Sequence, residues 1–201
     1  TGQGRAAPFF ALRAAKKGAP AVTRLLEGPL PVSEWEGAEG APAPNAGLPR
    51  FRHATFHAAY PLARLELADK AVPLRVALEV FNPLIPGDSE RSGLPVALIR
   101  VRLRNPSRLP VQASAAAALP NFIGTDGFAL QLDDFRGNLL PTGAKGGRNT
   151  WRQSPGLRGV RLASTGVATD DAAWGTLALT TTARRGVTHR TAWAEGGWSD
   201  A

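Results

Sequence analysis

Two neighbouring segments of this chain alternate apolar and polar residues with a period of two. Leucine or valine occupies every second position from 74 to 80, and in residues 99–104 apolar residues alternate with Arg100, Arg102 and Arg104. Successive side chains of a β-strand point to opposite faces, so this period predicts strands with one buried and one solvated face. Strands of this kind are typical of an antiparallel sheet.

Eight further segments have the composition of strands and are separated by turn residues such as Asn105-Pro106-Ser107 and Arg185-Gly186. No segment shows a convincing helical period. The sequence therefore predicts an all-β fold, a two-sheet antiparallel β-sandwich with long irregular loops. The ten expected strands cover residues 9–15, 21–27, 54–60, 62–68, 74–82, 96–105, 111–119, 156–164, 174–183 and 187–193.

Two stretches rich in glycine and proline interrupt this spacing, at residues 28–49 and 137–155. Connections longer than about 15 residues without structure of their own are usually functional, docked on something or disordered. Trp35 lies in the first stretch and Trp151 in the second, which favours docking over disorder. Strand patterns resume on both sides of each stretch, so we interpret both as long loops and not as domain linkers.

The net charge of +8 would suit nucleic acid or an anionic surface. The basic residues are dispersed, however, and a chain rich in Arg, Ala, Gly and Pro is typical of a GC-rich genome. We therefore expect no nucleic-acid partner. No run of 18 apolar residues occurs, so no transmembrane segment is expected. The absence of cysteine excludes disulfides and thiolate metal sites, and localisation stays open.

Glycoside hydrolysis by acid/base chemistry requires two carboxylates across a substrate cleft. Three acidic pairs occur in turn-like contexts, and neighbours in sequence usually cap turns or face solvent, which is our interpretation of all three. They are Asp133 with Asp134, Asp170 with Asp171, and Glu34 with Glu36.

The remaining residues that could form a metal, nucleophile, phosphate or sugar site indicate no such site. His53, His57 and His189 lack HxH or HExxH spacing, so we expect no metal and no other cofactor. The chain has no GxSxG motif and no cysteine nucleophile, and GAKGG at residues 143–147 lacks the spacing of a P-loop. The tryptophans could stack on sugars, but packing is the interpretation we favour for them. They are Trp35, Trp151, Trp174, Trp193 and Trp198.

Segments along nearly the whole chain resemble, in the same order, the amino-terminal domain of the family 116 glycoside hydrolases. That family includes the bile-acid or non-lysosomal β-glucosylceramidases and bacterial β-glucosidases. The most specific similarities are PRFR and YPLARLEL within residues 49–67, and FNPLIPGDSERSGLPVALIRVRLRNP at residues 81–106. Further matching segments are FFALRA, LLEGPLP, GLRGVRLAS and AWGTLALTTT.

The resemblance implies an amino-terminal β-sandwich that packs against a carboxy-terminal catalytic (α/α)6 barrel of the same chain. It implies a retaining mechanism with a carboxylate nucleophile and an acid/base, both in the barrel, and a β-glucoside or glucosylceramide-like substrate for the full protein. Residues 1–201 are therefore expected to be a fragment, one non-catalytic domain whose first part is missing. The alternative is a stand-alone carbohydrate-binding or anion-binding sandwich.

The loop after residue 81 holds the one site that we predict. Leu84 and Ile85 are apolar residues in a loop punctuated by proline and glycine, and apolar residues at a loop tip usually meet another surface. In the resembling family this loop lies in the sandwich that abuts the barrel, so we expect it to help dock the two domains. The expected docking residues are Asn82, Pro83, Leu84, Ile85, Pro86 and Asp88.

Overall fold

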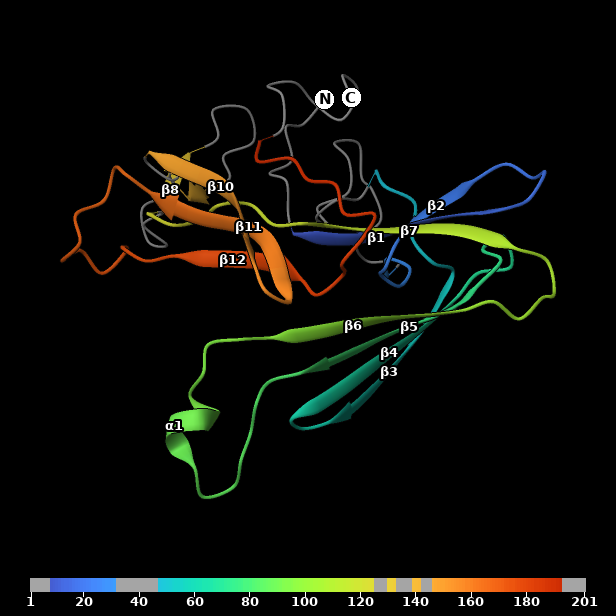
Figure 1. Ribbon diagram of the computed structural model, residues 1–201, viewed down its shortest axis with the longest axis horizontal. Helices are drawn as coiled ribbons and strands as arrows, with labels where there is room; N and C mark the ends of the chain where they lie inside the picture. Colours follow the sequence, from blue (N-terminus) through green and yellow to red (C-terminus); the bar gives the residue numbers. More distant parts are fainter. Residues whose placement is uncertain (1–7, 32–46, 125–129, 133–138, 142–145, 193–201) are drawn as a thin grey trace. The chain divides into compact units, whose positions relative to one another are not determined.

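The computed structural model describes residues 8–31, 47–124, 130–132, 139–141 and 146–192. Within these ranges the chain is all-β and every strand pairing is antiparallel, which confirms the predicted fold class (Figure 1). The chain divides into two compact units, Thr1–Ala118 and Leu119–Ala201.

The first unit contains two sheets and one short helix. The first sheet has the order β2-β1-β7 and the second the order β3-β4-β5-β6. The elements are β1 (Phe9–Lys16), β2 (Val22–Leu25), β3 (His53–Ala59), β4 (Leu62–Ala68), β5 (Arg75–Phe81), α1 (Ser89–Ser92), β6 (Leu98–Arg104) and β7 (Val111–Ala118). Seven of the ten expected strands correspond to these within a few residues.

Apolar side chains from both sheets pack together to form the core of the first unit. Leu12 and Ala14 of β1 contact Leu67 of β4 and Val76 and Leu78 of β5. These five side chains are almost completely buried, together with Leu26, Phe51 and Val72 from the connections. In a β-sandwich the apolar faces of two sheets pack against each other in this way.

The alternation predicted the solvated face of β6 correctly, but in β5 Ala77, expected on the solvated face, is only 8% exposed and belongs to the buried residues. Arg100, Arg102 and Arg104 are exposed, as expected. On the opposite face Val101 packs against the core, but Ile99 and Leu103 are 41% and 38% exposed. The physical reason is that β6 is an edge strand with a sheet neighbour on one side only.

The second unit contains the sheet β10-β11-β12 and the two-stranded pairing β8-β9. Its strands are β8 (Leu130–Leu132), β9 (Leu139–Pro141), β10 (Gly147–Ser154), β11 (Leu157–Ser164) and β12 (Leu177–Thr181). Asn121 joins the start of this unit to the sheet, because its Nδ2 donates to Asn149 Oδ1 at 2.9 Å and to the carbonyl of Ala163 at 2.8 Å. The side chain of Leu162 is buried in β11.

Two predictions about the second half were wrong. The stretch 137–155 is not one irregular loop, because β10 pairs with β11 through eight consecutive residue pairs and Trp151 lies in that strand. β10 is polar and contains glycine, so its pairing with β11 overrides a weak local preference. The strand expected at residues 187–193 is absent from the described part, residues 187–192. Most of the other predicted loop, 32–46 with Trp35, lies outside the described residues.

Candidate functional site

The loop from Asn82 to Val96 begins with a tight turn. The backbone N–H of Asp88 donates to the carbonyl of Ile85 at 3.0 Å, with Pro86 and Gly87 at the two central positions. Gly87 has φ +83°, a conformation in which a Cβ is strained. Proline followed by a glycine of positive φ is the pattern of a type II turn, so the local sequence specifies this turn.

The same loop is held in shape by its own side chains. Asp88 precedes α1, and its Oδ1 accepts a hydrogen bond from the backbone N–H of Arg91 at 2.8 Å, which is the geometry of an N-cap. The hydroxyl of Ser92 accepts from the N–H of Ile85 at 2.9 Å and donates to its carbonyl at 3.1 Å. Asp88 therefore organises the loop from within, and its role as a docking contact stays a prediction.

This ordered loop presents apolar side chains to solvent. Leu84 and Ile85 are 42% and 43% exposed, as their position in the loop led us to expect. Asn82 and Pro86 are also exposed, and Pro83 is half-buried. The loop thus holds the predicted residues in one defined conformation with their apolar members outward.

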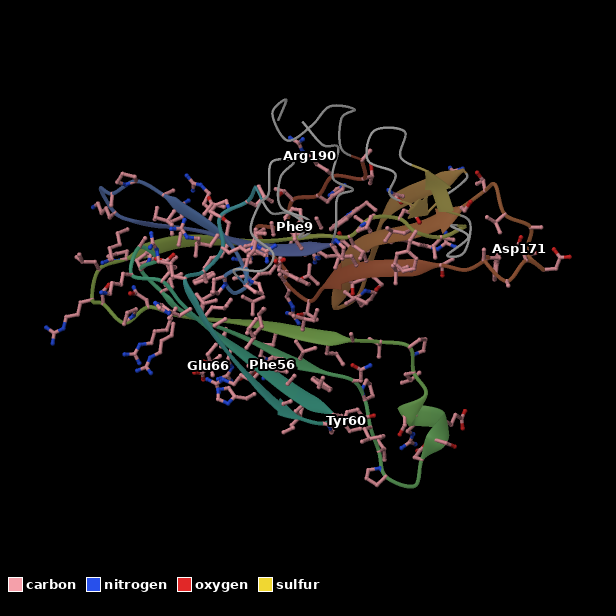
Figure 2. The ribbon with its side chains drawn as sticks, turned by 180° about the vertical axis from the view of Figure 1, so that it is seen from behind. Phe9, Phe56, Tyr60, Glu66, Asp171 and Arg190 are labelled. Atoms are coloured by element: carbon pink, nitrogen blue, oxygen red, sulfur yellow. The ribbon has the colours of Figure 1, made fainter. Side chains whose placement is uncertain are left out.

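Further exposed apolar residues lie at the same end of the sheet β3-β4-β5-β6. Ala59, Leu62, Phe81 and Leu98 form one continuous row of cross-strand partners, and Tyr60 lies at the turn between β3 and β4 (Figure 2). The loop that carries α1 joins β5 to β6 at this end (Figure 1). We call the exposed large apolar residues here the end patch: Tyr60, Leu62, Phe81, Leu84, Ile85, Leu94, Val96 and Leu98.

Sequence reasoning found only two members of the end patch. The sequence contained a signal for three others. Leu62, Phe81 and Leu98 each occupy one of the alternate positions of their strand that are otherwise mostly polar. Phe81 continues the series of Arg75, Ala77 and Glu79, and Leu98 continues that of the arginines of β6. An apolar residue at the end of each polar series predicts an apolar area on the otherwise solvated face.

Charged residues follow the end patch along this face of the sheet. Glu79 Oε1 lies 3.0 Å from Nε of Arg102, and Glu79 Oε2 lies 3.4 Å from Nη1 of Arg100. Further along, Arg75 and Arg104 are direct cross-strand partners. Arginine outnumbers acidic residues here, so the apolar end patch adjoins a cationic strip.

The carboxylates proposed as pairs do not form a catalytic site where the structure describes them. Oδ1 of Asp171 accepts from the N–H of Ala173 at 2.7 Å, so this residue caps a turn as expected. Asp133, Asp134, Glu34 and Glu36 lie outside the described residues. Among the described ranges no three His, Cys, Asp or Glu side chains gather as metal ligands.

Asp69 is the one acidic side chain of the described residues that is buried. Its Oδ2 lies 2.9 Å from Nε of Arg24 in β2, and its Oδ1 accepts from the N–H of Ala71 at 2.8 Å. Burial alone would raise the pKa of Asp69, but the Ala71 N–H and the Arg24 guanidinium outweigh it and hold the pKa below its ordinary value. The hollow beside it, about 360 Å³ and lined by Arg52, His53, Asp69, Lys70 and Ala71, thus contains one carboxylate that is already paired.

The two tryptophans of the described residues, Trp151 and Trp174, differ in their surroundings. Trp151 stacks on His189, with ring centroids 4.0 Å apart and ring planes 7° from parallel, so one face of its indole is covered. Trp174 is 49% exposed and follows the turn that Asp171 caps. Trp35, Trp193 and Trp198 lie outside the described residues.

A comparison with protein families decides which family this all-β chain represents. The model described as beta-glucosidase 2, glycosyl-hydrolase family 116 N-term, matches residues 3–200. The chain belongs to this family. The resemblance recognised in the sequence is therefore confirmed, and an amino-terminal domain of a family 116 hydrolase implies a catalytic partner domain. No curated protein matches the sequence. None of the helices in the described ranges could span a membrane.

The loop of this family 116 amino-terminal domain should depend on the Asp88 cap. Replacing Asp88 with alanine leaves the N–H of Arg91 without its acceptor, at a cost of about 1 kcal/mol. We expect faster amide hydrogen exchange at Arg91 and Ser92 and a lower free energy of unfolding. Glu90→Ala, in the same helix, is the control and should change neither quantity. Equal exchange rates in both variants would contradict the role of the cap.

Proposed function

We propose that this chain is the non-catalytic sandwich domain of a retaining β-glucosidase or glucosylceramidase-like enzyme, and that its end patch packs against the catalytic (α/α)6 domain of the same protein. The observation that carries the proposal is the gathering of eight exposed large apolar residues at one end of the sheet β3-β4-β5-β6. Large contiguous apolar areas on soluble proteins mark interaction sites. Membership of the family implies a catalytic partner domain, which supports the end patch as a surface for it.

Three carboxylates of the described residues have structural roles, which favours a non-catalytic domain. Asp69 is paired with Arg24, Asp88 caps α1, and Glu79 bridges two arginines of β6. Each of these groups is engaged in holding the fold or its surface. We assign the hydrolysis of a β-glucoside or glucosylceramide-like substrate to the partner domain.

The order of the loop supports docking as well. Binding surfaces that must be ordered on contact lose affinity to conformational entropy. The turn at Pro86-Gly87, the Asp88 cap and the Ser92 hydroxyl already fix the positions of Leu84 and Ile85. Docking therefore requires little further ordering of this loop.

Replacing both Leu84 and Ile85 with aspartate tests the proposal. In the 201-residue chain the two side chains are already partly in solvent, so we expect a change in stability of less than about 1 kcal/mol. In the full-length enzyme the change would bury two charges without partners, at a cost of several kcal/mol unless the interface opens. The measurement is thermal unfolding of both proteins, with activity on an aryl β-glucoside for the full-length enzyme.

Leu109→Asp provides a matched control, because Leu109 is 61% exposed in another loop of the same unit. This variant should leave the full-length enzyme as stable and active as the wild type. If the double substitution destabilises the 201-residue chain as much as the full-length enzyme, Leu84 and Ile85 serve the sandwich alone and the docking proposal fails.

A further inference from the structure

The strand β3 forms one edge of the sheet β3-β4-β5-β6, and all seven of its residues are exposed. Every residue of β3 pairs in continuous register with β4, so the strand has no bulge. Alternate N–H and C=O groups of an edge strand point away from the sheet. No described residue hydrogen-bonds to this outer side of β3.

Edge strands of soluble proteins usually carry features that prevent pairing with another chain. Charged residues, proline and bulges are the common ones. The opposite edge, β6, has three arginines in seven residues, whereas β3 has the sequence HATFHAA, without Lys, Arg, Asp, Glu, Pro or Gly. The edge strand β6 is therefore better protected than β3 against pairing with another chain.

The sequence of β3 is also complementary to itself in an antiparallel pairing. Phe56 is the central residue of His53–Ala59, so a twofold axis at Phe56 sets Phe56 opposite its own copy. Ala54 then lies opposite Ala58 of the second copy, and Thr55 lies opposite His57. Apolar residues meet apolar residues on one face, and aromatic cross-strand pairs stabilise a sheet. The same operation on β6 would set Arg100 opposite Arg102 of the second copy, where like charges repel.

We propose that β3 is a pairing edge at which two copies of this chain join antiparallel through their β3 strands, to form one eight-stranded sheet. Phe56 is 66% exposed and lies in the middle of the strand (Figure 2), so it is the main apolar group that the contact buries. The strand β7 is also an edge without charges, but its side chains are mostly alanine and offer little apolar area. The proposal concerns β3 alone and does not depend on the end patch.

The interface is small, which determines the affinity to look for. Interfaces below about 1,200 Å² of total buried area are generally weak and transient. We therefore expect a monomer–dimer equilibrium that sedimentation equilibrium detects between roughly 10 µM and 1 mM protein. A chain that stays monomeric over this range would overturn the proposal.

The variant Phe56→Lys tests the site. It places two lysines opposite each other at the twofold axis, so self-association should weaken at least about tenfold. Leu109→Lys is the control, because Leu109 is an apolar residue, 61% exposed, in the loop between β6 and β7. Leu109→Lys should dimerise like the wild type. If Phe56→Lys dimerises as strongly as Leu109→Lys, the contact does not involve β3 and the proposal is wrong.

Amide hydrogen exchange of the wild type gives a second test that needs no variant. Raising the protein concentration should slow exchange at alternate residues of β3, those whose N–H points away from β4. Residues of β6 and β7 should exchange at the same rate at both concentrations. If exchange slows with concentration at β7 and not at β3, the dimer forms through the other sheet and the proposal is wrong.

Discussion

Replacing Asp69 with alanine should lower the free energy of unfolding by about 3 kcal/mol, because it leaves the partner of a buried ion pair without compensation. The carboxylate is 1% exposed and Arg24 is 19% exposed, so water replaces little of the lost contact. Arg24 belongs to β2 and Asp69 follows β4, so the pair joins the two sheets of the first unit. Chemical denaturation of the 201-residue chain measures the effect.

Glu66→Gln is the control for Asp69→Ala. Glu66 Oε1 lies 2.9 Å from Nη2 of Arg64, but both side chains are 49% exposed. Exposed pairs of this kind contribute between zero and about 1 kcal/mol. If the two substitutions change stability equally, the burial of Asp69 has no energetic consequence and the argument fails.

The same residue gives the chain a defined response to acid. The pKa of Asp69 is lowered in the folded state, so protonation favours unfolding. The contribution of Asp69 to the free energy of unfolding is complete above a pH of about 4, the pKa of aspartate in the unfolded chain. It disappears as the pH falls through the lower pKa that Asp69 has in the folded chain. The stability difference between wild type and Asp69→Asn should therefore shrink in that acid range and stay constant near neutral pH.

Replacing Gly159 with alanine should destabilise the second unit by about 3 kcal/mol or more, because the added methyl group has no space. A Cβ at this position would overlap the carbonyl oxygen of Leu179 and lie 2.6 Å from Cα of Thr180. These are backbone atoms of β12, the strand that pairs with β11 at Gly159. No rotation of a side chain relieves the overlap, so the two strands must separate locally.

Gly175→Ala is the matched control in the same unit. A Cβ there meets nothing within 4 Å, so the change in stability should stay within about 0.5 kcal/mol. Amide exchange at β11 and β12 locates the effect, and it should accelerate only in Gly159→Ala. Equal unfolding midpoints for the two variants would contradict the close packing at Gly159.

Local sequence alone determined the strands that alternate cleanly. β4, β5 and β6 were predicted within about two residues, because their period-2 pattern already separates a buried face from a solvated one. The turn at Pro86-Gly87 and the Asn105 turn, where Asn105 Oδ1 accepts from the N–H of Ser107 at 3.0 Å, were likewise readable from residue types. Each of these features depends on neighbours in sequence.

Features that depend on pairing or packing with another segment were harder to predict. β10 forms by pairing with β11, from which only Pro155 and Gly156 separate it, although its own residues are polar. The end patch requires the register that aligns Leu62, Phe81 and Leu98 across three strands; the alternation marks each of these residues on its own strand but does not show that the three meet. The Arg24–Asp69 pair links residues 45 positions apart. A local pattern specifies which way a side chain points from its own strand, whereas pairing and packing decide what it meets there.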